Sequence, residues 1–248
     1  AFHLLPSLDP YYISVNHGKP FTIMYTSKGC PYDCIYCNVS RSKVKMKSAE
    51  RTMEEIRYLK ENYNIKTISF FDESFTLDKE RALEICKQIK KYNIKWYCNT
   101  RTSLITLPLL KEMREAGCRA ISYGIESGSQ KILDNASKRA TVEQHADAIK
   151  WADIAGIKTH CSFIFGLPGE TKETINETLR FIRKTLPRSI EFNIATPYPG
   201  TRLYDYAVQH GWIKKDINWH NLYQDISNFE NRDISNEYLE KVRRKAYA

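Results

Sequence analysis

Three cysteines lie close together near the start of the sequence. Cys30, Cys34 and Cys37 are separated by three and then two residues, so one loop can place all three sulfurs on one face of a metal centre. A [4Fe–4S] cluster that only transfers electrons takes four cysteine thiolates. Three ligands leave one iron open to bind a substrate group. The spacing therefore predicts a [4Fe–4S] cluster with an open, catalytic iron.

A zinc site and buried structural thiols are the alternatives for this cysteine triad. Zinc sites usually combine Cys-x2-Cys with a second close pair of Cys or His. The remaining cysteines are isolated in the sequence, at Cys86, Cys98, Cys118 and Cys161. A non-catalytic zinc or electron-transfer module would need a fourth ligand near the triad, and the sequence offers none. Cys98 is expected to be an inert buried thiol.

The elements that must position the triad follow a repeating pattern. Four times, Asn or Gly ends a helix-like segment and is followed by an apolar residue, a basic residue and a strand-like segment. These ends are Asn64-Ile65-Lys66, Asn93-Ile94-Lys95, Gly117-Cys118-Arg119 and Gly156-Ile157-Lys158. Asn and Gly tolerate the left-handed conformation of a helix C-cap. Alternating helices and strands predict βαβ units and a parallel sheet.

Six strand–helix units are expected, with strands at 21–27, 67–71, 96–98, 120–123, 159–165 and 189–195. Parallel strands wound in one hand form either a barrel or a doubly wound sheet. The motifs favour an α/β fold, a partial (β/α)6 TIM-like barrel over residues 21–210. Residues 1–20 are expected to be a linker or N-terminal extension. Residues 211–248 are expected to be a C-terminal extension with a short basic helix capped by Ser235, and the chain to be a fragment of a longer protein.

Composition narrows the class of protein. A chain of 248 residues with 42% hydrophobic residues can bury one large core. We expect no secretory signal, the sequence contains no long apolar run, and seven cysteines in a chain of this length do not suit a disulfide framework. We expect a reduced, cytoplasmic protein without a membrane span. The net charge of +9 is scattered, which favours a solvated lysine-rich surface over a nucleic-acid partner.

The triad, with Tyr36 before its last cysteine and a strand before its first, resembles the radical S-adenosylmethionine (SAM) superfamily. The resemblance covers roughly residues 21–210 and implies that the open iron of the cluster binds the amino and carboxylate groups of SAM. One electron then breaks a carbon–sulfur bond, which yields methionine and a 5′-deoxyadenosyl radical that abstracts a substrate hydrogen. A reductant such as flavodoxin or ferredoxin is implied, and the substrate, small-molecule or macromolecular, is unknown.

The resemblance also implies SAM contacts at the carboxyl ends of the strands, where barrel active sites gather. These are, for the methionyl amine, Asp72 and Glu73; for the SAM carboxylate or the substrate, Asn99 and Arg101; for the ribose and carboxylate, Glu126 and Ser127; and for the adenine, Tyr36, Gly166, Thr196 and Tyr198.

Structural alternatives exist for several of these residues. Asp72 or Glu73 can instead cap the next helix, and Gly166 can be an ordinary turn residue. Glu126 is expected to be functional, because an acidic residue that closes an apolar strand is costly if it is buried without a partner. His160 is expected to lie in the core or to line the barrel pore.

Five segments resemble the cobalamin-dependent branch of the superfamily: 71–76, 98–101, 124–129, 166–171 and 196–201. Members of that branch methylate unactivated carbon or phosphorus, or close rings, and carry a cobalamin domain before the barrel. A methyltransferase or cyclase core is therefore expected, with cobalamin held outside this chain, because His17-Gly18 has Val15 where the cobalamin motif needs Asp. The alternative is a cobalamin-independent enzyme that modifies RNA or a metabolite, related to the methylthiotransferases.

Overall fold

The computed structural model describes residues 2–11, 18–213, 231 and 233–246. Six strands form one sheet in the order β1 (Phe21–Met24), β4 (Thr67–Phe70), β5 (Lys95–Thr100), β6 (Cys118–Glu126), β7 (Lys158–Phe165) and β8 (Ser189–Ile194). The pairs β1–β4, β4–β5, β5–β6 and β7–β8 are parallel. A separate antiparallel pair joins β2 (Ser27–Lys28) to β3 (Lys45–Met46).

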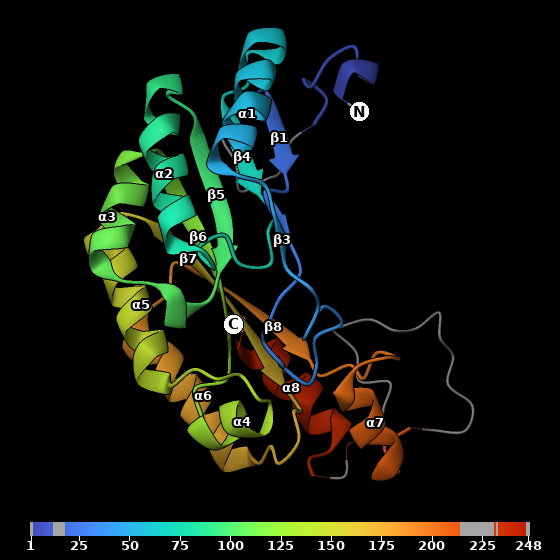
Figure 1. The fold of residues 1–248 in the computed structure, drawn as a ribbon. Helices are drawn as coiled ribbons and strands as arrows, with labels where there is room; N and C mark the ends of the chain where they lie inside the picture. The colour runs from blue at the N-terminus through green and yellow to red at the C-terminus, as the bar shows by residue number, and fades with distance from the viewer. Residues whose placement is uncertain (1, 12–17, 214–230, 232, 247–248) are drawn as a thin grey trace. The chain divides into compact units, whose positions relative to one another are not determined.

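The helices alternate with these strands along the chain (Figure 1). They are α1 (Ala49–Tyr63), α2 (Lys79–Ile89), α3 (Leu107–Glu115), α4 (Gln130–Asn135), α5 (Val142–Ile154), α6 (Lys172–Thr185), α7 (Arg202–Gln209) and α8 (Asn236–Ala246). Short 3-10 turns lie at Phe2–Leu4, Lys90–Tyr92 and Thr102–Leu104. The described part of the chain forms two compact units, the first from residues 1–29, 43–123 and 148–159, the second from 30–42, 124–147 and 160–248.

In the first unit, helix α1 follows the predicted pattern. Ser48 caps its start by accepting a hydrogen bond from the Arg51 backbone N–H, and Asn64 ends it in the left-handed conformation. Asn93, Gly117 and Gly156 also have positive φ angles. All four predicted helix ends are therefore confirmed.

The first predicted strand, 21–27, is wrong in its length. β1 ends at Met24, and Ser27 belongs instead to the antiparallel pair β2–β3. Between the two strands, the backbone N–H of Thr26 donates to the carboxylate of Asp72, at 2.7 Å. Because this N–H bonds to a side chain rather than to a neighbouring strand, the parallel ladder stops here.

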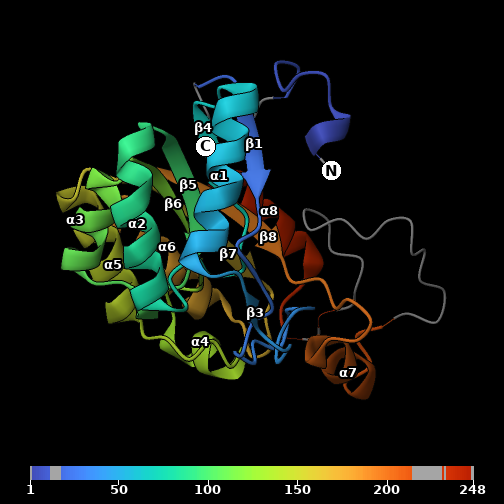
Figure 2. The same cartoon turned by 45° about the horizontal axis from the view of Figure 1, so that its top comes forward.

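In the second unit, aromatic side chains of β7 and β8 pack against one another in the hydrophobic core. Phe165 stacks on Phe192, and their ring centroids lie 5.2 Å apart. Helix α8 lies against β8 (Figure 2), and Arg243 on this helix donates to the Phe192 carbonyl at 2.8 Å. Ser235 accepts a hydrogen bond from the Tyr238 backbone N–H, so the capped, basic final helix is confirmed.

Parts of the sequence expectations fall outside the described residues. These include His17 and Val15 of the compared cobalamin motif and most of the irregular segment between Gly211 and Ser235. Within the described ranges, no helix combines the length and the apolar composition that crossing a bilayer requires.

Candidate functional site

The three cysteines lie on an irregular loop of the second unit, Cys30–Ser42, here called the cysteine loop. Its two ends are tied together: the Cys30 N–H donates to the Ser42 hydroxyl at 2.9 Å, and the Ser42 N–H donates to the Cys30 carbonyl at 3.0 Å. The Arg41 N–H donates to the Tyr32 carbonyl at 2.8 Å. The loop is therefore closed by its own backbone and needs no regular secondary structure.

Ile35 fixes the cysteine loop to the rest of the second unit. Its N–H donates to the Ala136 carbonyl at 3.1 Å, and its carbonyl accepts from the Leu203 N–H at 2.9 Å. Its side chain is buried in an apolar cluster that includes Leu167 and Trp212. Ile35 thus points into the core, and its neighbours Cys34 and Tyr36 can face a ligand.

The thiols suit an iron–sulfur cluster by their chemistry. None of the three cysteines forms a disulfide bond within the described part of the chain. Burial raises the pKa of the Cys37 thiol, a hydrogen bond with the Val39 backbone lowers it, and charge repulsion from Cys34 and Cys30 raises it. A cationic metal centre relieves that repulsion. Among the described residues no three His, Cys, Asp or Glu side chains converge on a single ion, but a cluster takes each thiolate on a different iron, so the donor set fits.

A buried ion pair lies beside the loop, at the end of β6. Lys138 Nζ and Glu126 Oε1 are 2.8 Å apart, and the two side chains are only 6% and 7% exposed. Lys138 also donates to the Tyr36 hydroxyl at 3.3 Å. Burial, followed by the charge of Glu126, holds the pKa of Tyr36 well above its ordinary value. The three groups form one hydrogen-bonded unit next to the thiols.

The backbone is shaped around this ion pair. Glu126 has a φ of +68°, a left-handed conformation that costs a non-glycine residue about 1–3 kcal/mol. A Cβ at Gly124 would lie 2.4 Å from Glu126 Oε1, so a larger residue there would displace the carboxylate from its position. Strain of this kind persists where the surroundings enforce it and is concentrated at functional sites.

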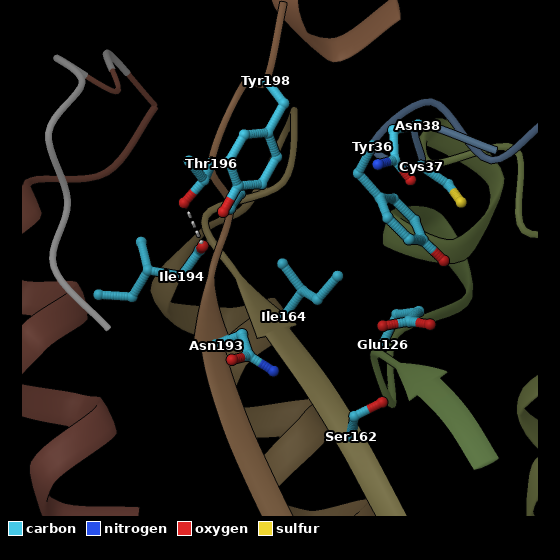
Figure 3. A pocket seen from close by; sticks show the side chains of 11 residues that line it. Tyr36, Cys37, Asn38, Glu126, Ser162, Ile164, Asn193, Ile194, Thr196 and Tyr198 are labelled. Atoms are coloured by element: carbon cyan, nitrogen blue, oxygen red, sulfur yellow. Dashed lines mark hydrogen bonds between the residues drawn. The ribbon is translucent and has the colours of Figure 1, made fainter. Parts of the chain in front are cut away.

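A cavity of about 500 Å³ opens beside the ion pair. Its walls come from the cysteine loop, from β6, β7 and β8, and from the segment that follows β8. They consist of Tyr36, Cys37, Asn38, Glu126, Ser162, Ile164, Asn193, Ile194, Ala195, Thr196 and Tyr198. Figure 3 shows the Tyr36 ring and the Glu126 carboxylate facing each other on one side, and Tyr198 and Thr196 on the other. The cavity thus has a charged wall and an aromatic and aliphatic wall.

Five residues that the sequence placed at the site line this cavity: Tyr36, Cys37, Glu126, Thr196 and Tyr198. Ser127 and Gly166 belong to the same unit but are not among its lining residues.

Ser127 instead holds its own loop against helix α6. Its hydroxyl lies 3.0 Å from the Thr178 hydroxyl, and the Thr178 hydroxyl accepts from the Gly128 N–H at 2.9 Å. Gly166 has a φ of +87° and packs against Leu239 and Asn231 of the C-terminal segment.

Glu170 supports the turn that Gly166 begins. It is buried and accepts hydrogen bonds from the Gly166 N–H, at 3.3 Å, and from the Thr174 hydroxyl. Burial raises the pKa of Glu170 from 4.5 to about 7, with a smaller contribution from Glu177, while the two hydrogen bonds lower it.

In the first unit, Asp72 is completely buried, and its carboxylate is held by hydrogen bonds and an ion pair within the protein. Its carboxylate accepts hydrogen bonds from the Thr26 N–H and hydroxyl and from the Ser27 hydroxyl, and Arg81 lies 3.6 Å away. The N-cap of the next helix is Asp78, so the capping alternative for Asp72 and Glu73 is wrong.

The other predicted residues of the first unit lie near the same strand ends. Glu73 accepts a hydrogen bond from the Gly29 N–H at 3.1 Å, just before the cysteine loop. The Asn99 side chain donates to the Asp72 carbonyl at 3.4 Å. Arg101 is buried and directly precedes a 3-10 turn.

Sequence reasoning missed Lys138 and the polar cavity residues Asn38, Ser162 and Asn193. Lys138 follows the short helix α4, and no periodic pattern marked it. Ser162 and Asn193 could have been found by strand alternation, because Ser162 and Ile164 occupy alternate positions of β7 and Asn193 pairs with Ile164 across the sheet. The outward neighbours Cys161 and Phe163 are fully buried.

The radical SAM superfamily model matches residues 24–182 of this chain. The chain belongs to the radical SAM superfamily. It is 37% identical to the uncharacterized methyltransferase PH0819 of Pyrococcus horikoshii, over the whole chain and 54% of that protein. It is 30% identical to the anaerobic magnesium-protoporphyrin IX monomethyl ester cyclase of Rubrivivax gelatinosus, over 78% of this chain and 36% of that protein.

Among solved structures, the fold resembles that of the radical SAM methyltransferase TsrM of Kitasatospora setae, which has cobalamin and a [4Fe–4S] cluster bound. The alignment covers 79% of this chain and 38% of the TsrM chain, with a TM-score of 0.70 and 18% sequence identity. The likeness confirms the predicted α/β fold of radical SAM partial barrels. This radical SAM chain spans about half the length of PH0819 and less of the cyclase. The comparisons give the methylthiotransferase alternative no better support.

Replacing Asp72 by Ala should lower the free energy of unfolding by about 3–5 kcal/mol, because it leaves Arg81 buried without its partner. The matched control is Asp78→Ala, which removes only a helix cap and should cost about 1 kcal/mol. Both are measured by urea denaturation followed by circular dichroism. If Asp72→Ala costs no more than Asp78→Ala, the structural role of Asp72 is wrong.

Glu170 should make stability fall as the pH rises. Since its folded pKa of about 7 lies above the ordinary 4.5, the folded state holds the extra proton, and this stabilisation is complete below pH 4.5 and lost through pH 7. Between pH 5 and 8 the wild type should lose about 2.5 kcal/mol relative to Glu170→Gln. Urea denaturation over this range tests it, with the exposed Glu173→Gln as control; parallel wild-type and Glu170→Gln profiles would contradict it.

Proposed function

We propose that this chain is the radical SAM domain of a cobalamin-dependent methyltransferase or cyclase, with a [4Fe–4S] cluster on Cys30, Cys34 and Cys37. The observation that carries the proposal is the closed cysteine loop beside a cavity that is lined by Glu126, whose carboxylate is paired with the buried Lys138. When bound, the cluster supplies the electron that cleaves SAM. SAM would occupy the cavity.

The chain's own residues then divide the binding of SAM between the two walls. SAM carries an ammonium, a sulfonium and ribose hydroxyls, for all of which a carboxylate is a favourable partner. Glu126 offers that carboxylate, and Lys138 balances its charge when no ligand is present. The adenine would lie between Tyr36 and the segment Ile194–Tyr198, where aromatic and aliphatic side chains exclude water. SAM contacts from Asp72, Glu73, Asn99 and Arg101 remain predictions.

The shape of the cavity serves the chemistry that follows cleavage. A primary carbon radical reacts with whatever lies nearest, so the walls must exclude solvent and bring a substrate hydrogen close. Ser162 and Asn193 are the uncharged polar groups of the wall formed by β7 and β8. They are suitably placed to orient a polar substrate with hydrogen bonds.

Methyl transfer or ring closure is supported by the named relatives, of which one is a methyltransferase and one a cyclase. Cobalamin is supported by the branch-like segments at the strand ends and would be held outside this chain. The proposed division into a linker, 1–20, a barrel, 21–210, and an extension, 211–248, accompanies this assignment. A low-potential cluster also needs a protein electron donor and a reducing compartment, for which we propose the cytoplasm.

Replacing Cys34 by Ala should abolish SAM cleavage and leave a folded protein, because one cluster ligand is lost while Ile35 still anchors the loop. The measurement is 5′-deoxyadenosine formed from SAM by anaerobically reconstituted protein with dithionite, together with iron content and circular dichroism. The control is Cys98→Ala, a buried thiol outside the cysteine loop, which should retain cleavage. Cleavage by Cys34→Ala at the wild-type rate would contradict the proposal.

Removing the Glu126 carboxylate should weaken SAM binding. Glu126→Gln should raise the dissociation constant for SAM about tenfold or more, because it leaves the buried Lys138 charge uncompensated beside a cationic ligand. Lys138→Met should not raise the constant, because the cationic ligand can then compensate Glu126. Equilibrium dialysis with the reconstituted protein measures it. The control is Ser127→Ala, adjacent in sequence but directed at Thr178, which should change the constant by less than about threefold. Equal effects of all three variants would show that Glu126 has no special part in binding.

A further inference from the structure

The cysteine loop carries a cluster of arginines that the proposed function does not use. We propose that Arg41, Arg139 and Arg202, gathered around Asp33, form the docking surface for an acidic one-electron carrier protein. This inference rests on the proposed function, because it names the partner that reduces the cluster. The three arginines and Asp33 are here called the arginine patch.

The arginine patch is built on the cysteine loop itself. Arg139 Nε lies 2.9 Å from Asp33 Oδ1, and Arg41 and Arg202 lie 3.4 and 3.8 Å from Asp33 Oδ2. Arg202 also donates to the Asp33 backbone carbonyl. The arginines come from three places in the chain: the end of the loop, the segment after α4, and the first residue of α7. They converge on the residue that directly precedes Cys34.

The charge of the patch is unbalanced and accessible. Every salt bridge found for these arginines in the described part of the chain goes to Asp33, so three positive charges share one negative charge. The side chains of Arg41 and Arg139 are 61% and 65% exposed, whereas that of Asp33 is 12% exposed. The Asp33 carboxylate is thus enclosed, and the guanidinium groups are presented to solvent around it.

An acidic electron carrier fits this surface better than other partners. Electron transfer weakens steeply with distance, so a donor must bind close to the cysteines, and Asp33 and Cys34 are joined by a peptide bond. Exposed guanidinium groups pair with carboxylates in two-pronged geometry, and opposite charges accelerate association by about 10- to 1,000-fold at low ionic strength. A nucleic acid also seeks positive charge, but three arginines on one carboxylate give a compact patch rather than a track along a phosphate backbone.

The test uses the double variant Arg41→Gln/Arg139→Gln and two reductants. Arg202 is kept because it holds the loop backbone. 5′-Deoxyadenosine formation is driven either by dithionite, which needs no docking surface, or by flavodoxin with its NADPH-dependent reductase. The matched control is Arg180→Gln/Arg183→Gln, which removes two exposed arginines from helix α6 of the same unit. Iron content and flavodoxin affinity, by calorimetry, are measured for each protein.

We expect the flavodoxin-driven rate to fall about tenfold in the patch variant at low ionic strength and its affinity for flavodoxin to fall with it. The dithionite-driven rate and the iron content should be unchanged, and the α6 variant should match wild type.

An unchanged flavodoxin-driven rate would overturn the docking surface and leave the proposed function standing. An equal fall of the rates with flavodoxin and with dithionite would also overturn the docking surface, because the arginines would then be needed for the cluster itself rather than for the electron carrier. Absence of product from the wild type with both reductants would refute the proposed function itself.

Discussion

An irregular loop can present three thiols only if the rest of the protein holds its backbone. The cysteine loop meets this constraint through Ile35, whose N–H and carbonyl are both hydrogen-bonded outside the loop and whose side chain is buried in the core. Buried backbone groups without partners would be costly, so this anchoring fixes which neighbours face inward. Tyr36 is then directed at the Glu126–Lys138 pair, and Gly124 and the strained Glu126 backbone make room for that pair. The cavity follows from these contacts.

Most of the fold could be predicted because local rules govern it. Each helix end with Asn or Gly needs a left-handed residue, and Asn64 and Gly156 supply one. The β2–β3 pair could not be predicted, because Thr26 leaves the parallel ladder to bond to Asp72, which is 46 residues away in sequence. Local propensity carries no information on such a contact. The short helix α4, which is additional to the six expected strand–helix units, could not be predicted for a similar reason, since it is set by packing rather than by a long apolar period.

The residues of the candidate site likewise fall into those that local motifs predict and those that depend on tertiary contacts. Tyr36, Glu126 and Tyr198 were predicted from motifs at strand ends, and all three line the cavity. Lys138 could not be predicted, because its role depends on a chain reversal after α4 that brings its ammonium group back to Glu126. Ser127 was expected to face the ligand, but its hydroxyl bonds to Thr178 on α6. Motifs identify which segments reach the site, whereas packing decides which side chain of each segment enters it.

The measurement that tests the central claim most directly is electron paramagnetic resonance of the anaerobically reconstituted, reduced protein, with and without SAM. Three thiolate ligands and an open iron predict about four irons per chain and a cluster signal that changes when SAM is added, because SAM becomes a ligand of the cluster. Bound zinc in place of iron, or a cluster signal that SAM leaves unaltered at saturating concentration, would contradict the account.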